Sequence, residues 1–298
     1  MISLKSYIYL VLSGFLVGII GVFVKLIGDK VHFTTLVFYR MLIAFIFVLI
    51  IIPFMDKNFM KIKKKELSHY ILVGILLAIT FSLFTVANVF APVQNVILIS
   101  NFAPFLVLIL GAIFLRERIT RDKIITLIIA FVGIIILNPF KLNESFLGNS
   151  LALVQALSFA VLVVIMRKEN KEHLIGSVVW FLFFATLFML PFPFIFGFGD
   201  LSGNVLWYIL VLGILSTGVA YLLQSLAMQK VTAGISSIII MVSMPIAGIV
   251  FAFIILNEPL NLRILIGGVV LIGAGIYLQV RNKEFKHAVR SAFGLCAN

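Results

Sequence analysis

Long apolar runs separated by short polar segments dominate the chain. Breaks at charged residues, proline and glycine divide it into ten runs, most of them about twenty residues long, the length of a helix that crosses a bilayer core. Barrel strands would instead alternate apolar and polar residues over about ten positions. The pattern therefore predicts an all-α integral membrane protein. We place the ten expected transmembrane helices near residues 7–27, 33–54, 68–90, 93–115, 122–139, 146–166, 174–196, 205–228, 233–256 and 262–280.

Composition supports this fold class and removes several alternatives. Of the residues, 63% are hydrophobic and 11% are charged, whereas a soluble domain carries about 25% charged residues. The net charge of +12 comes from Lys and Arg in the segments between runs, which argues against a nucleic-acid partner. The one cysteine, Cys296, rules out a disulfide framework and a cysteine metal site. The first run continues to Leu26 without a small-residue cleavage site, so we expect a retained first helix.

The positions of the basic residues predict the orientation. With ten spans, both termini lie on one side of the membrane. If that side is the cytoplasm, its segments hold eighteen Lys and Arg residues, against three in the outer segments. Because cytoplasmic loops carry the excess of Lys and Arg, we expect a multi-pass protein of the cell membrane with both termini in the cytoplasm.

The two halves of the chain share a pattern. Pro104 and Glu117 reappear 141 residues later as Pro245 and Glu258, and only eight prolines and eleven acidic residues occur in the chain. Five spans per half is an odd number, so the second half must be inverted relative to the first. Inverted halves are a recurring plan of secondary transporters. The predicted units are a first repeat of 1–140, a second repeat of 141–281 and a basic cytoplasmic tail of 282–298.

The repeated stretches, residues 104–120 and 245–261, resemble the drug/metabolite transporter superfamily, in particular its EamA-type branch with two tandem EamA domains. Further similarity lies at Gly14 to Lys25 and at Phe38 to Ala44. Arg116 and Asn257 stand where the family usually has glycine. The resemblance implies ten helices around a central cavity, and uptake or efflux of amino acids or other small metabolites without ATP.

Two cations inside the runs, Lys25 and Arg40, are candidate substrate-binding residues. A charge at bilayer depth costs about 2.5–3.5 kcal/mol, and no Asp or Glu falls inside any run beyond Asp122, the first residue of the fifth. One hypothesis is that both residues line a water-filled cavity and attract a carboxylate of the substrate. The alternative is that Lys25 reaches the interface and that Arg40 binds helix-end carbonyls.

Polar residues and prolines inside the runs complete the candidate site. Pro104 and Pro245 lie near mid-span and are expected to kink the cavity wall, although membrane helices also tolerate proline for packing. Gly14 and Gly18 are expected to allow close helix packing. We interpret Glu117 as capping or ordering the loop beside Arg116 and Arg118. The other substrate-binding candidates, each with interhelical hydrogen bonding as the alternative, are Asn101, Gln155, Trp180, Tyr221 and Gln224.

Motifs of enzymes and ATPases are missing from the sequence. The four histidines are scattered without metal-ligand spacing, and no phosphate-binding Gly-Lys-Ser/Thr loop occurs. We therefore expect no enzyme activity, no metal and no cofactor. The expected function is secondary transport of small metabolites by alternating access, as an exporter or exchanger, with amino acids or related carboxylates as substrates. The partners are then a small-molecule substrate and the bilayer, and the protein is a monomer or homodimer. A lipid flippase and an accessory membrane subunit are the alternatives.

Overall fold

The structure is a computed structural model, and it describes residues 4–60, 64–91, 93–137, 146–168, 174–257 and 262–281. Glu258, Cys296 and the predicted tail lie outside the described residues. Within these ranges the chain is helical and no β-strand forms. The first half contains α1 (Leu4–Gly18), α2 (Ile20–Ile27), the short 3₁₀ helix η1 (Gly28–Lys30), α3 (Phe33–Met55), α4 (Lys64–Phe90), α5 (Val93–Ser100), α6 (Ala103–Leu115) and α7 (Arg121–Leu137).

The second half repeats this series of helices. Its third run, 205–228, is interrupted by a π-helical segment, η2, in which the backbone hydrogen bonds span five residues. Its elements are α8 (Phe146–Lys168), α9 (Leu174–Met189), α10 (Pro191–Phe196), α11 (Val205–Gly213), η2 (Ile214–Val219), α12 (Ala220–Met228), α13 (Ala233–Leu256) and α14 (Leu262–Arg281).

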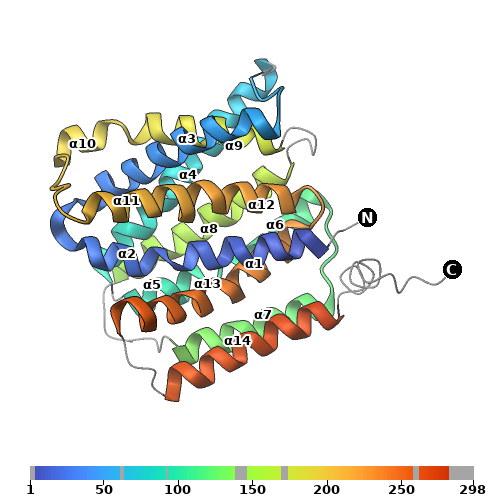
Figure 1. Ribbon diagram of the computed structural model, residues 1–298. Helices are drawn as coiled ribbons and strands as arrows, with labels where there is room; N and C mark the ends of the chain where they lie inside the picture. Colours follow the sequence, from blue (N-terminus) through green and yellow to red (C-terminus); the bar gives the residue numbers. More distant parts are fainter. Residues whose placement is uncertain are drawn as a thin grey trace.

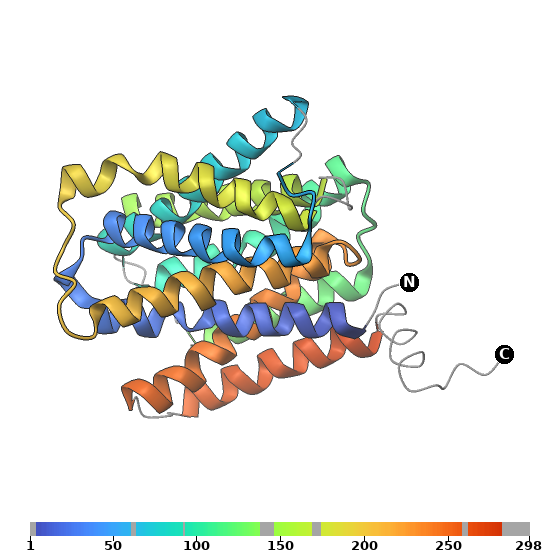
Figure 2. The same ribbon diagram turned by 45° about the horizontal axis from the view of Figure 1, so that its top comes forward.

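Eight helical segments of the described chain are long and apolar enough to cross a membrane. They coincide with eight of the ten predicted runs. The other two runs, 122–139 and 262–280, form α7 and α14, which pack against each other at one edge of the bundle (Figures 1 and 2). The 17 residues of α7 span about 25 Å at 1.5 Å per residue, slightly less than a hydrocarbon core of about 30 Å. The count of ten spans remains a prediction.

The two predicted kink prolines occupy different local structures. Pro104 lies in the first turn of α6, after a break at Asn101 and Phe102 that separates α5 from α6. A proline costs little there, because the first-turn N–H has no helical partner anyway. Pro245 instead lies inside the continuous helix α13. Only the first of the two runs is therefore interrupted at its proline.

The helices of the two halves choose corresponding partners. Helix α1 of the first half packs along α13, and its counterpart in the second half, α8, packs along α5 and α6. Likewise, α4 packs along α8, and its counterparts η2 and α12 pack along α1. Helices α6 and α13 also end in the same way, at the left-handed residues Arg116 (φ 55°) and Asn257 (φ 52°), which are 141 residues apart. The Arg116 N–H donates to the Gly111 carbonyl, and the Asn257 N–H donates to the Ala252 carbonyl, five residues earlier in both helices. Residues 141 positions apart in the sequence therefore occupy corresponding places in α6 and α13.

Glycines allow the close approach of α1 and α13. A Cβ atom on Gly14 would lie 1.8 Å from the Ser243 hydroxyl oxygen, and one on Gly18 would lie 2.4 Å from the Met244 carbonyl oxygen. Both distances are far below contact, so a larger residue at either position would separate the helices. The expected packing role of this glycine pair is confirmed.

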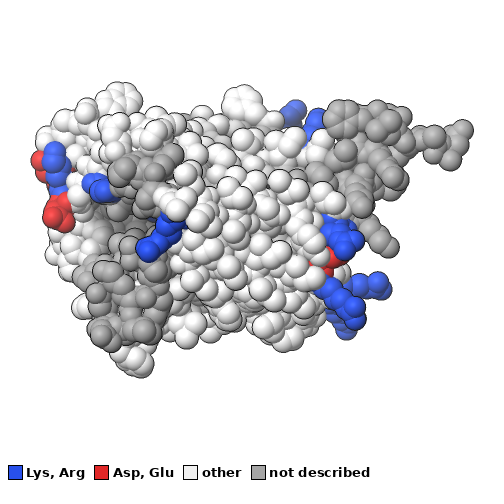
Figure 3. All heavy atoms as spheres, turned by 90° about the horizontal axis from the view of Figure 1, so that it is seen from below, with Lys and Arg blue, Asp and Glu red and all other residues white. Residues whose placement is uncertain are grey.

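Charges gather at the two ends of the bundle, with a broad uncharged band between them (Figure 3). The start of α1 and the end of α14 lie at the same end (Figure 1). This distribution fits a helical bundle that crosses an apolar layer.

Candidate functional site

Arg40 of α3 is buried in the bundle, with 5% of its surface exposed. Its Nη2 atom donates a hydrogen bond to Oγ1 of Thr217 at 3.3 Å. Its guanidinium carbon lies 4.9 Å from the centre of the Phe81 ring, where a desolvated cation–π interaction contributes about 2 kcal/mol. Three elements, α3, α4 and η2, therefore surround this charge.

The π-helical segment η2 presents Thr217 to Arg40. The Thr217 hydroxyl donates to the carbonyl of Leu212, five residues earlier, at 3.0 Å, and so its oxygen lone pair remains to accept from Arg40. Two glycines bring α3 close to this segment. A Cβ atom on Gly213 would lie 2.5 Å from Cγ2 of Ile43, and one on Gly218 would lie 2.8 Å from Cδ1 of Phe47. π-Helical turns are frequent at functional sites.

Tyr221, one turn after Thr217, completes an aromatic side of the site. It is buried, and its ring centre lies 6.4 Å from that of Phe81. We call Arg40, Phe81, Thr217 and Tyr221 the Arg40 cluster. Two of its members, Phe81 and Thr217, were not among the sequence-based candidates.

The Arg40 cluster lacks a carboxylate. In the part of the chain that the structure describes, no Asp or Glu forms an ion pair with Arg40, and its buried Nε atom has no hydrogen-bond partner. A buried charge is usually paired or hydrogen-bonded to saturation, because desolvation is costly. The cluster is therefore electrostatically complementary to an anionic group of a ligand.

Gln155 and Gln224 are also buried. Oε1 of Gln155 has no hydrogen-bond partner among the described residues. One turn further along α8, the Ser158 and Thr80 hydroxyls are 2.7 Å apart and join α8 to α4. Gln224 follows Tyr221 by one turn of α12. Both amides therefore lie on helices that contribute to, or pack against, the Arg40 cluster.

Of the other three candidates, Asn101 and Trp180 donate hydrogen bonds to backbone carbonyls and Lys25 is exposed. The Asn101 side-chain amide donates to the Ile97 carbonyl at 2.8 Å and so supports the break between α5 and α6. Trp180 donates from Nε1 to the Phe59 carbonyl at 3.0 Å, which ties the segment after α3 to α9. Lys25 is exposed in the last turn of α2, unlike the buried Arg40 cluster.

Helix α3 is tied at both of its ends to the span formed by α9 and α10. At one end Trp180 bonds to Phe59, as described above. At the other end the Tyr39 hydroxyl donates to the Phe198 carbonyl at 2.9 Å, and the Thr35 hydroxyl donates to the Gly197 carbonyl at 2.9 Å. Tyr39 and Trp180 are 141 residues apart. Each is an aromatic residue that donates from its polar tip to the chain following the partner helix.

Glu117 caps a helix of the opposite half. Its carboxylate oxygens accept from the N–H groups of Ala233 at 2.9 Å and Gly234 at 3.2 Å, at the start of α13. Arg167 of α8 lies 3.9 Å from the same carboxylate. The expected capping role is present, but the partners come from α8 and α13 and not from the neighbouring loop, because Arg116 ends α6 in a left-handed turn that directs the chain toward α13.

No group of three metal-binding side chains occurs among the residues that the structure describes. Proteins similar to this chain include transporters. An uncharacterized transporter of Archaeoglobus fulgidus is 31% identical over 236 residues, which cover 75% of this chain and 81% of that protein. An S-adenosylmethionine uptake transporter of Rickettsia bellii is 30% identical over 170 residues, covering 56% of this chain and 57% of that protein.

A solved structure and a family model add to these relatives. A protein of known crystal structure shares the fold, with a TM-score of 0.79 at 13% identity, covering 93% of this chain and 97% of that one. A model of the EamA-like transporter family matches residues 4–138 and matches again at residues 146–281. The resemblance of the repeated stretches is thus confirmed, and the chain belongs to the EamA-like transporter family of multi-pass membrane proteins.

Proposed function

We propose that this protein is a secondary transporter of small carboxylate-bearing metabolites and that Arg40 binds the carboxylate. The observation that carries the proposal is the buried guanidinium without a carboxylate partner among the described residues. Charged residues inside membrane segments usually mark a substrate or ion pathway. An arginine also presents paired N–H donors that match the two oxygens of a carboxylate.

The proposed architecture is ten transmembrane helices in two inverted repeats, with both termini in the cytoplasm. Corresponding helix partners and the matched helix ends at Arg116 and Asn257 support the repeat. The ties made by Tyr39 and Trp180 support the inversion, since residues 141 positions apart act at opposite ends of the same helix pair. With this orientation, Tyr39 acts at the exterior and Trp180 at the cytoplasmic side.

Alternating access then requires these ties to open in turn. In the described structure both ends of the α3–α9 pair are tied, and Arg40 is buried between them. Opening of the Tyr39 end gives the Arg40 cluster access to the exterior, and opening of the Trp180 end gives access to the cytoplasm. A substrate that binds between the two ends is thereby exposed to one side at a time.

The substrate class follows from the chemistry of the cluster. The cation attracts a carboxylate, and the Phe81 and Tyr221 rings can contact an apolar or cationic part of the same molecule. Amino acids carry both features. The named substrate of the Rickettsia bellii relative, S-adenosylmethionine, also carries a carboxylate and a cationic centre. We propose export or exchange of such compounds, by alternating access, as the transport mode.

Counterflow in proteoliposomes tests the proposal. The purified protein is reconstituted with an unlabelled candidate inside, and entry of the same labelled compound is measured for amino acids and S-adenosylmethionine. The wild-type protein is expected to exchange at least one carboxylate compound and not its amide. The variant Arg40→Gln is expected to fold but lose this exchange. Equal exchange by the variant would remove Arg40 from the binding site.

A further inference from the structure

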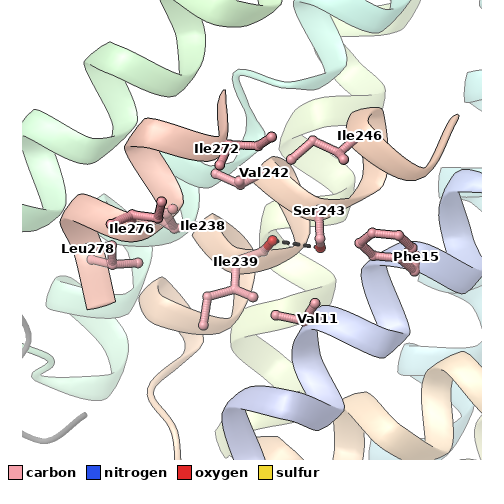
Figure 4. A pocket seen from close by; sticks show the side chains of 11 residues that line it. Val11, Phe15, Ile238, Ile239, Val242, Ser243, Ile246, Ile272, Ile276 and Leu278 are labelled. Carbon is pink, nitrogen blue, oxygen red and sulfur yellow. Dashed lines mark hydrogen bonds between the residues drawn. The ribbon is translucent and has the colours of Figure 1, made fainter. Parts of the chain in front are cut away.

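An apolar pocket lies where α1, α13 and α14 meet (Figure 4). Its volume is about 180 Å³. The principal side chains that line it are Val11 and Phe15 of α1, Val242 and Ile246 of α13, and Ile272 and Ile276 of α14.

The polar atoms of this pocket are already satisfied. Ser243 contributes the one lining hydroxyl, which donates to the Ile239 carbonyl of its own helix at 2.8 Å (Figure 4). None of the described residues that line the pocket is charged. An engineered cavity of about 150 Å³ with a similar aliphatic and aromatic lining stays dry and binds benzene. An apolar occupant is therefore expected here.

The pocket opens toward the surroundings of the protein at mid-membrane depth. Ser243 is the eleventh of the 24 residues of α13, and Phe15 lies near the middle of the span Leu4–Lys30. Ile272 and Ile276 form part of the rim and are 47% and 56% exposed. In a membrane protein, the material in contact with such a rim is the hydrocarbon of the bilayer.

We propose that one acyl chain of a bilayer phospholipid occupies this pocket and lies between α1 and α14 against α13. Lipid tails are as apolar as leucine, so transfer into the pocket brings no hydrophobic gain. Occupancy is favoured instead because an empty void leaves its lining without dispersion contacts. A helix of a second copy is about 10 Å wide and cannot enter a space of 180 Å³, whereas an extended hydrocarbon chain can.

The position of the pocket gives the bound chain a structural role. Helix α1 belongs to the first half and α13 and α14 to the second, so the acyl chain fills a seam between the halves. Next to it, Gly14 and Ser243 make the close α1–α13 contact. The proposal is independent of the Arg40 cluster.

Photo-crosslinking tests the proposal in nanodiscs. The full-length protein is placed in phosphatidylcholine with a diazirine near the middle of one acyl chain, irradiated, and mapped by mass spectrometry of its peptides. Crosslinks concentrated on the residues that line the pocket are expected. A matched pair of variants separates this site from general lipid contact. Gly275→Leu places a side chain in the pocket, since its Cβ would lie 3.1 Å from Val242, whereas a Cβ at Gly273 meets nothing within 4 Å.

Gly275→Leu is expected to abolish the pocket crosslinks, and Gly273→Leu is expected to retain them. Val11→Phe fills the pocket from α1 and must give the same loss, which keeps the test valid if Gly275→Leu does not fold. Equal labelling of all helix faces, or pocket labelling that survives both filling variants, would overturn the proposal. Crosslinks between two protein chains at these residues would also overturn it, in favour of a dimer contact.

Discussion

The tie between Tyr39 and the Phe198 carbonyl gives the sharpest prediction about conformational change. Tyr39→Phe removes one hydroxyl and keeps the ring. The lost bond is short, at 2.9 Å, but exposed, so its net contribution lies in the lower part of the usual range, about 0.5–1 kcal/mol. A free-energy change of this size should raise the population of the state that is open at this end about two- to fivefold. The Thr35 bond to Gly197 remains, so the end opens more often but does not stay open.

A single reporter cysteine measures this change. Cys296→Ser removes the native thiol, and Ser216→Cys places a new one beside Thr217, where the native side chain is 1% exposed. Labelling by a membrane-impermeant maleimide added outside right-side-out vesicles is expected to accelerate two- to fivefold in Tyr39→Phe. Adding Thr35→Val should accelerate it further.

Tyr208→Phe is the matched control, because its hydroxyl makes no hydrogen bond among the described residues. It is expected to leave the labelling rate unchanged. Trp180→Phe should accelerate labelling only from the opposite side, in inside-out vesicles. An unchanged rate in Tyr39→Phe, or an increase from the cytoplasmic side, would refute the assignment of this tie to the exterior gate.

Three further substitutions test other contacts. Thr217→Val keeps the side-chain shape but leaves Arg40 without its acceptor, so a destabilisation of about 1–3 kcal/mol is expected in denaturant titrations. Glu117→Gln keeps one acceptor for the α13 N-terminus and loses the charge that faces Arg167; a loss of about 1 kcal/mol is expected, and a rise in the melting temperature would contradict the capping role. Gly18→Leu should destabilise the fold by several kcal/mol, whereas Gly21→Leu should not, because a Cβ at Gly21 meets nothing within 4 Å.

Features that depend on local residue type could be predicted from the sequence. Apolar runs located the spans, because backbone polar groups in lipid must be satisfied within a helix. The small residues Gly14 and Gly18 indicated close packing, and the repeated Pro and Glu residues revealed the offset of 141. Arg40 was recognised as a candidate because a charge in an apolar run is rare.

Features that depend on which helices meet could not be predicted in this way. Phe81 is one of 30 phenylalanines, and only the packing of α4 against α3 places its ring on Arg40. The acceptors of Tyr39 and Trp180 are backbone carbonyls, which every residue type provides. The pair Ser216 and Thr217 between Gly213 and Gly218 was a usable signal, since small and polar residues interrupt an otherwise apolar run there.

Binding measurements on a carboxylate and its amide test the central claim about Arg40 most directly. A substrate identified by counterflow and its carboxamide analogue are titrated, by calorimetry, into wild-type protein and into Arg40→Gln. The four affinities give one coupling energy between the guanidinium and the carboxylate. A buried charge-assisted pair predicts a coupling of about 1.5–3 kcal/mol, with the carboxylate preferred only by the wild-type protein. A coupling near zero, with both proteins preferring the carboxylate equally, would contradict the proposed site.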